Sequence, residues 1–100
     1  MNRFDPAQAK VGAILIGIDP SSLLSNRDEL ELSRLDIQRQ LIASGIKRHT
    51  MIQVNLQGVI VQGNHGARAA AERGLPIDII IVDLPYPNFG PILQIPVANR

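Results

Sequence analysis

Residues 58–74 read Gly-Val-Ile-Val-Gln-Gly-Asn-His-Gly-Ala-Arg-Ala-Ala-Ala-Glu-Arg-Gly, and this stretch decides the fold. A short apolar strand is followed by Gly63, a residue that tolerates the tight backbone of a strand-to-helix turn. Asn64 suits the N-cap of a helix, and the alanines after it are the best helix formers. Gly74 then ends the helix. The stretch therefore predicts a strand, a glycine turn and a short α-helix.

Further strands are predicted on both sides of this unit. Residues 51–56 alternate apolar with polar side chains and lead through Gly58 into the next strand, as in a β-hairpin whose turn needs a positive φ. Residues 13–18 and 77–82 are continuous apolar runs, so we expect two buried strands. Residues 92–97 predict one last edge strand.

A second helix is predicted over residues 28–44, which contain good helix formers and neither Gly nor Pro. Its apolar side chains form two clusters on nearly opposite faces. The helix is therefore either covered on two sides or broken near Ser33, where a sequence similar to a capping box begins. Acidic side chains at its start suit the helix dipole, and we interpret them as local electrostatics: Asp28, Glu29 and Glu31. Arg34 and Arg39 are interpreted as solvated helix positions.

The spacing of strands and helices predicts a single α+β (mixed α/β) domain, with helices packed on a mixed sheet. The length of 100 residues suits one hydrophobic core. Apolar residues form 45% of the chain and charged residues 19%, so the chain can bury enough surface to fold. We expect a core over residues 13–83 with peripheral segments at 1–11 and 85–100. The polar segment 1–11 suggests an entry segment prone to disorder.

Composition excludes several classes of function. The chain has no Cys, which excludes disulfides, thiolate nucleophiles and Cys-ligated metals. Its histidines are His49 and His65, which nothing in the sequence brings together, so no metal site is expected. We find no apolar run near the roughly 20 residues that span a bilayer and no signal peptide, and expect a cytoplasmic protein without a membrane partner. A net charge of +1 does not support DNA binding by bulk electrostatics.

The glycine turn is the candidate binding site. The first N–H groups of a helix are unpaired, and a preceding glycine lets an anion approach them, phosphate above all. His65 and Arg68 lie on one helical face and could add donors. Purely structural roles are equally open: Gly63 for close strand–helix packing, Asn64 as a cap, and Arg68 in a surface pair with Glu72.

A longer pattern runs across roughly residues 13–83. In chain order it comprises an apolar strand with Asp19-Pro20 and Leu23-Leu24, a helix ending Ser44-Gly45, Ile52-x-Val54, Gly58-x-Ile60-x-x-Gly63, Asn64-His65, Ala69-Ala70 and Gly74. This pattern resembles the ParB/sulfiredoxin-like family. Members of that family include CTP-hydrolysing partition proteins, ATP-using sulfiredoxins, a free-serine kinase and proteins described as nucleases. Their turn after the hairpin opens a helix whose N-terminus holds nucleotide phosphates.

The resemblance implies a nucleotide- or phosphate-binding site formed by Gly63, Asn64, His65, Gly66 and Arg68. Gly63 matches the family glycine, His65 matches the histidine of the sulfiredoxin and kinase-like versions, and Arg68 matches the last arginine of the partition-protein box. Gly66 departs from the family, because most members have a phosphate-binding Arg there. Asn64 stands where sulfiredoxins have their catalytic Cys, which excludes sulfiredoxin chemistry. The implied ligand is a nucleotide such as CTP or ATP, with or without Mg²⁺.

The leading hypothesis is a ParB-like domain that binds a nucleotide or phosphate ligand, with any nucleotidase activity secondary. One alternative is a non-enzymatic protein-interaction domain with a degenerate phosphate site. Another is a ParB-like DNA-binding or nuclease domain of the kind found in bacterial conflict and mobile-element proteins. Tyr86 and Phe89 could dock on the domain or on a second subunit of a homo-oligomer. The basic cluster Lys47-Arg48-His49 is expected to follow a helix end, where cations are favoured.

Overall fold

The predicted β-hairpin lies near the middle of the sheet in the computed structural model, which describes residues 1–46 and 51–100. It is formed by β4 (Ile52–Val54) and β5 (Val59–Gln62), which pair antiparallel. Gly58 in its turn has a φ of 83°, as the sequence predicts. The basic cluster Lys47-Arg48-His49 lies outside the described residues.

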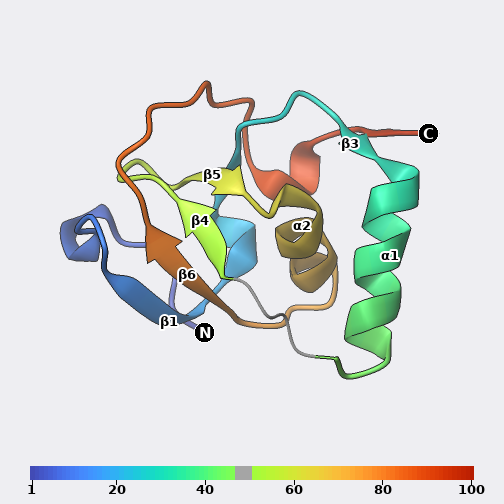
Figure 1. Ribbon diagram of the computed structural model, residues 1–100, viewed down its shortest axis with the longest axis horizontal. Coiled ribbons are helices and arrows are strands. Elements are labelled where there is room, and N and C mark those ends of the chain that lie inside the picture. The colour runs from blue at the N-terminus through green and yellow to red at the C-terminus, as the bar shows by residue number, and fades with distance from the viewer. Residues whose placement is uncertain (47–50) are drawn as a thin grey trace.

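The hairpin belongs to a five-stranded mixed sheet in the order β1-β6-β4-β5-β2 (Figure 1). β6 (Ile77–Ile81) runs parallel to β4 and antiparallel to β1 (Ile14–Ile18), and β2 (Leu24–Ser25) runs parallel to β5. A separate pair joins β3 (Leu30–Glu31) to β7 (Val97–Ala98). With its two α-helices, the molecule has the α+β fold that the sequence predicts.

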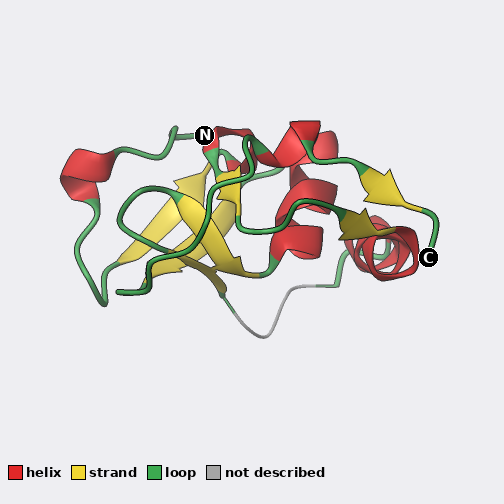
Figure 2. Ribbon diagram, turned by 90° about the horizontal axis from the view of Figure 1, so that it is seen from above, coloured by secondary structure: helices red, strands yellow, loops and turns green. Residues whose placement is uncertain are grey.

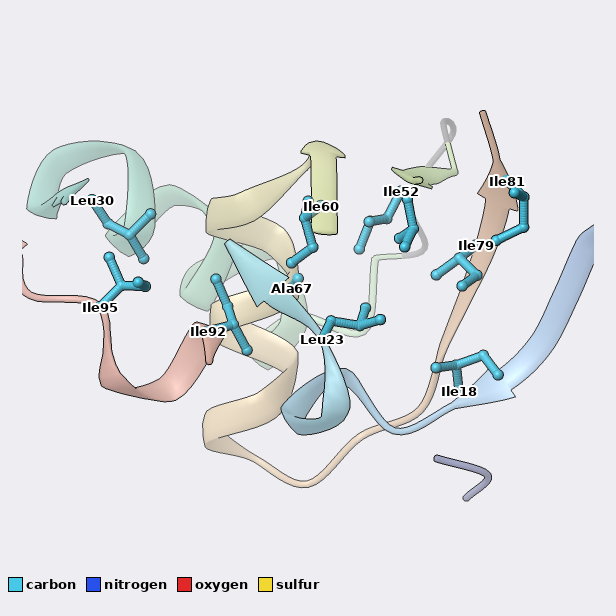
Figure 3. Packing of buried hydrophobic residues seen from close by; sticks show 11 residues of the cluster. Ile18, Leu23, Leu30, Ile52, Ile60, Ala67, Ile79, Ile81, Ile92 and Ile95 are labelled. Carbon is cyan, nitrogen blue, oxygen red and sulfur yellow. The ribbon is translucent and has the colours of Figure 1, made fainter. Parts of the chain in front are cut away.

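Helix α2 (Asn64–Glu72) lies between the sheet and helix α1 (Leu32–Ala43), as Figures 1 and 2 show from two directions. The sheet faces α2 with β-branched side chains that are almost fully buried, and Ala67 of α2 packs against them (Figure 3). The residues of the five-stranded sheet in this core are Ile18, Ile52, Val54, Ile60, Ile79 and Ile81. The small alanines of α2 let the helix approach the sheet closely, which explains why this helix can fit between two layers.

Helix α1 begins later than the sequence predicts. Residues 28 and 29 are not helical, and Leu30 and Glu31 are extended because they pair with β7, a strand pairing that outweighs weak helix propensity. The helix starts at Leu32, and its N-cap residue is Glu31. The Ser33 hydroxyl does not cap the helix and instead donates to the Arg100 carbonyl. Of the two alternatives, cover on two sides and a break near Ser33, the second agrees with the structure, since α1 begins at Leu32 and Leu35 is its one fully buried residue. Its end at Ala43, followed by Gly45 with a φ of 72°, agrees with the prediction.

Strand β1 is at the edge of the sheet, which corrects the expectation of a buried strand. Ile16 is 72% exposed and Ile14 is half exposed, whereas Ile18 at the end of the strand is only 3% exposed and belongs to the core. A continuous apolar run does not distinguish an edge strand from a central one, so periodicity alone could not place it.

Both terminal segments also differ from the expectation. Residues 1–11 are tied to the domain, since the Asn2 N–H donates to the Gly17 carbonyl and the Phe4 ring packs against Gly58. Residues 92–97 do not form one strand. Ile92–Gln94 is a 3-10 turn whose first residue is buried in the core, and the strand β7 starts only at Val97.

Candidate functional site

The N-terminus of α2 is open, with no side chain capping it. Gly63 is the N-cap with a φ of 104°, and its carbonyl accepts the first helical hydrogen bond from the Ala67 N–H at 2.9 Å. The backbone N–H groups of Asn64, His65 and Gly66 have no acceptor within residues 1–46 and 51–100. Three donors and the positive end of the helix dipole therefore point out of the fold together.

Gly63 also serves close packing, as the structural interpretation of the turn proposes. A Cβ atom built on it would lie 2.9 Å from Cγ1 of Ile52 in β4. The residue therefore needs glycine for two reasons, its positive φ and the lack of space.

Asn64 is not the N-cap that the sequence predicts. It is the first residue of α2 and is buried, and its side chain is directed to the loop after β2. Its Oδ1 accepts from the Ser25 hydroxyl at 2.8 Å, and its Nδ2 donates to Oδ1 of Asn26 at 2.7 Å. Asn26 in turn donates to the Val61 carbonyl at 3.2 Å. This network, which we call the asparagine network, fixes the loop after β2 against the start of α2.

A pocket of about 320 Å³ lies at the open end of α2. Its walls come from three separate parts of the chain. They are Asn26 and Arg27 after β2, Arg34 and Gln38 of α1, and Val61 and Gln62 at the end of β5 together with the adjoining residues 63–66. The predicted residues Gly63, Asn64, His65 and Gly66 are thus brought together in one cavity.

Two arginines give this pocket a positive charge. Guanidinium nitrogens of Arg27 and Arg34 lie 3.8 Å and 3.9 Å from the two carboxylate oxygens of Glu31. Both distances are long for an ion pair, so these pairs are weak; Arg34 is 57% exposed, whereas the Nε of the partly buried Arg27 also donates to the Glu29 carbonyl at 3.0 Å. One carboxylate shared by two guanidinium groups leaves a local excess of positive charge.

His65 is 6% exposed and lines the same pocket. Its Nε2 accepts a hydrogen bond from the Glu31 backbone N–H, so the neutral ring carries its proton on Nδ1. Among the described residues Nδ1 has no partner, and no fully buried polar side-chain atom there is left unpaired, so Nδ1 retains access to solvent. Burial, reinforced by the charges of Arg34 and Arg27, lowers the pKa of His65 to about 4. At neutral pH the ring is an uncharged donor at the pocket wall.

Arg68 does not line the pocket, although the sequence groups it with the turn. It is directed to the C-terminal segment, where one guanidinium nitrogen donates to the carbonyls of Ile92 and Ile95 at 3.1 Å and 2.8 Å. Its Nε also donates to Glu72 at 3.0 Å. The surface pair with Glu72 is therefore present, but it is part of a larger structural contact.

Glu72 also connects the two helices. Arg39 of α1 makes two hydrogen bonds of 2.8 Å to its carboxylate and a third, also of 2.8 Å, to Asp36. These contacts with Arg39, and that with Arg68, lower the pKa of Glu72, and Glu72 and Asp36 raise the pKa of Arg39. Arg39 is thus a bridge to α2, whereas the sequence suggests a solvated position.

Residues that sequence reasoning missed form half of the pocket. Arg27 carries no motif, and Arg34 has the periodicity of an ordinary exposed helix position. They meet α2 only because β3 pairs with β7 and starts α1 beside the glycine turn. No local signal in the sequence encodes that placement.

Within the described parts of the chain, no group of three or more His, Asp or Glu side chains is arranged to hold a metal ion. In those same parts no helix has the length and apolar character needed to cross a membrane. Searches of protein-family models, curated proteins and solved structures give no match to this chain. The resemblance to the ParB/sulfiredoxin-like family therefore stays a prediction.

Proposed function

We propose that this domain binds a phosphate-bearing ligand, in the first place a nucleotide, in the pocket at the N-terminus of α2. One observation carries the proposal: the pocket combines the guanidinium groups of Arg27 and Arg34 with three backbone N–H groups that have no acceptor in the described parts of the chain. Backbone donors at a helix start suit phosphate oxygens, and arginine adds charge and a planar pair of donors. In this proposal, these donors take the place of the phosphate-binding Arg that most ParB/sulfiredoxin-like proteins have at the position of Gly66.

The Nδ1–H of His65 is an independent feature of the same kind. This donor reaches solvent at the pocket wall and has no partner among the described residues, so an acceptor on a ligand can replace the water that binds it. Because the ring is neutral, it contributes a hydrogen bond without adding charge.

The volume of the pocket favours a small molecule over a macromolecule. About 320 Å³ lies at the lower end of the range of roughly 300–1,000 Å³ that is typical of small-molecule sites. A concave, polar cavity of this size suits a phosphate and the group next to it.

Binding, rather than hydrolysis, is the activity that the side chains support. The described lining residues include no carboxylate that could serve as a general base. His65 cannot take that role as it stands, since its Nε2 lone pair already accepts the Glu31 N–H. Nucleotidase activity is therefore not part of the proposal.

Thermal unfolding with CTP, ATP and GTP, each with and without Mg²⁺, tests the function. A ligand at a hundred times its Kd stabilises the native state by about 2.7 kcal/mol, which raises the Tm of a domain of this size by roughly 10 °C or more. Arg34→Met should reduce the shift. Arg73→Met, at the opposite end of α2, is the matched control and should not. The proposal fails if no nucleotide or inorganic phosphate raises the Tm, or if both variants respond alike.

A further inference from the structure

A second cavity, of about 150 Å³, adjoins the phosphate pocket and has the opposite character. It lies between the C-terminal half of α1, the middle of α2 and the start of β6. Its lining is almost entirely apolar and includes Leu41, Ile42, Ile46, Ala70, Leu75 and Ile77. We call it the apolar groove.

The two cavities meet at Gln38 and Gly66, which line both. Along one face of α1, Arg34, Gln38 and Ile42 follow one another at intervals of four residues, with a rise of about 6 Å between each. α2 shows the same order, from its open N-terminus at Gly66 to Ala70 one turn later. Both helices thus pass from polar to apolar in the same direction.

Apolar side chains at the rim of the groove are exposed in the absence of a ligand. Ile46 is 54% exposed and Leu75 is 40% exposed. A ligand that covers them gains the free energy of removing apolar surface from water. The donors in the adjoining pocket favour a phosphate group at the other end of that ligand.

We propose that the ligand is a phosphate monoester whose organic part is a single ring-sized apolar group. The phosphate lies against the α2 N-terminus and Arg34, and the ring lies in the apolar groove. The inference rests on the proposed phosphate binding but replaces the nucleotide as first choice of ligand, because the phosphate of a nucleotide is joined to a polar ribose, whereas the groove beside the phosphate donors is apolar. The size follows from the volume, since an apolar cavity of about 150 Å³ accommodates a molecule such as benzene. A long acyl chain does not fit.

Methyl phosphate and phenyl phosphate are the probes, titrated into the full chain while backbone amide shifts are followed by NMR. The wild-type protein should bind phenyl phosphate about tenfold more tightly than methyl phosphate, a difference of about 1.4 kcal/mol. Ile46→Ser and Leu75→Ser should reduce this ratio at least threefold and leave methyl phosphate binding unchanged. Because both side chains are exposed, neither variant should unfold, and the NMR spectra report this directly.

Ile37→Ser is the matched control. Ile37 is in α1 and Ile46 follows the end of that helix, but the two side chains are almost equally exposed, at 56% and 54%, and Ile37 does not line the groove. Its substitution should leave the ratio of the two affinities unchanged. Equal affinity for the two phosphates, or an equal effect of Ile37→Ser and Ile46→Ser, overturns the inference while the proposed function stands. Absence of binding by both phosphates overturns the proposed function itself.

Discussion

The Nε2 atom of His65 accepts a hydrogen bond of 3.0 Å from the backbone N–H of Glu31. This contact joins the first turn of α2 to the N-cap residue of α1, and it exists only while the ring is neutral. Protonation would place a donor against a donor in a buried site. The same contact therefore holds the pocket together and limits the pH range in which the pocket is intact.

Stability should fall as the pH decreases from about 6.5 to about 4. The pKa of His65 is lowered from 6.5 to about 4 by burial and by Arg34 and Arg27, so between these values the unfolded chain binds a proton that the native state does not. The free energy of unfolding then rises with pH across this window and is flat above it. The full effect is about 3 kcal/mol. Urea unfolding at a series of pH values measures it.

His65→Gln isolates this effect from the titration of the carboxylates. The variant keeps an amide group that can accept the Glu31 N–H but has no group that titrates in this range. The stability of the wild-type protein relative to the variant should therefore increase between pH 4 and pH 6.5. Parallel pH profiles of the two proteins would show that His65 is not the group responsible.

Gly63→Ala should destabilise the domain far more than Gly74→Ala. Both glycines have a positive φ, at 104° and 63°, but only a Cβ at position 63 meets a neighbour, Cγ1 of Ile52 at 2.9 Å. We expect a loss of about 3 kcal/mol at Gly63 from backbone strain and overpacking together, and about 1 kcal/mol at Gly74. Chemical denaturation measures both. Equal losses would mean that the contact with Ile52 relaxes without cost.

The elements that the sequence predicts well are those in which local propensity and tertiary pairing agree. The hairpin around Gly58 and helix α2 between Gly63 and Gly74 carry their turn residues within the element itself. The strand at Leu30 and Glu31 could not be predicted, because helix-forming side chains there are held extended by a strand more than 60 residues away. Helix propensity can be read from the sequence, but the distant strand that pairs with these residues cannot.

The same reason limits prediction of the candidate site. The glycine turn is a local feature, and four of the five residues that the sequence assigns to it line the pocket. Arg68 follows the same helical face in sequence terms, but the C-terminal segment provides two carbonyls that its guanidinium binds. Competition between a ligand and a distant backbone segment has no signature in a single sequence.

Asn64→Asp distinguishes the asparagine network from a helix cap. Aspartate is as good an N-cap as asparagine, so a capping role predicts little change. In the structure the Nδ2 of Asn64 donates to Oδ1 of Asn26, and a carboxylate would face that oxygen with no donor. We expect a loss of about 2 kcal/mol in the free energy of unfolding. The new negative charge at the pocket should also weaken phosphate binding. Unchanged stability would restore the capping interpretation.

Arg68→Met should lower stability without affecting phosphate binding, and Arg34→Met should weaken phosphate binding without affecting stability. The Arg68 side chain is 14% exposed and satisfies the carbonyls of Ile92 and Ile95, so its loss should cost about 2 kcal/mol of stability. Phosphate affinity should stay unchanged, because Arg68 does not line the pocket. Arg34 is 57% exposed and its ion pair with Glu31 is long, at 3.9 Å, so its replacement should change stability by less than about 0.5 kcal/mol. Its loss should weaken phosphate binding severalfold.

Denaturation and phosphate titration of the two variants measure both quantities, and a loss of affinity in Arg68→Met at full stability would return Arg68 to the binding site.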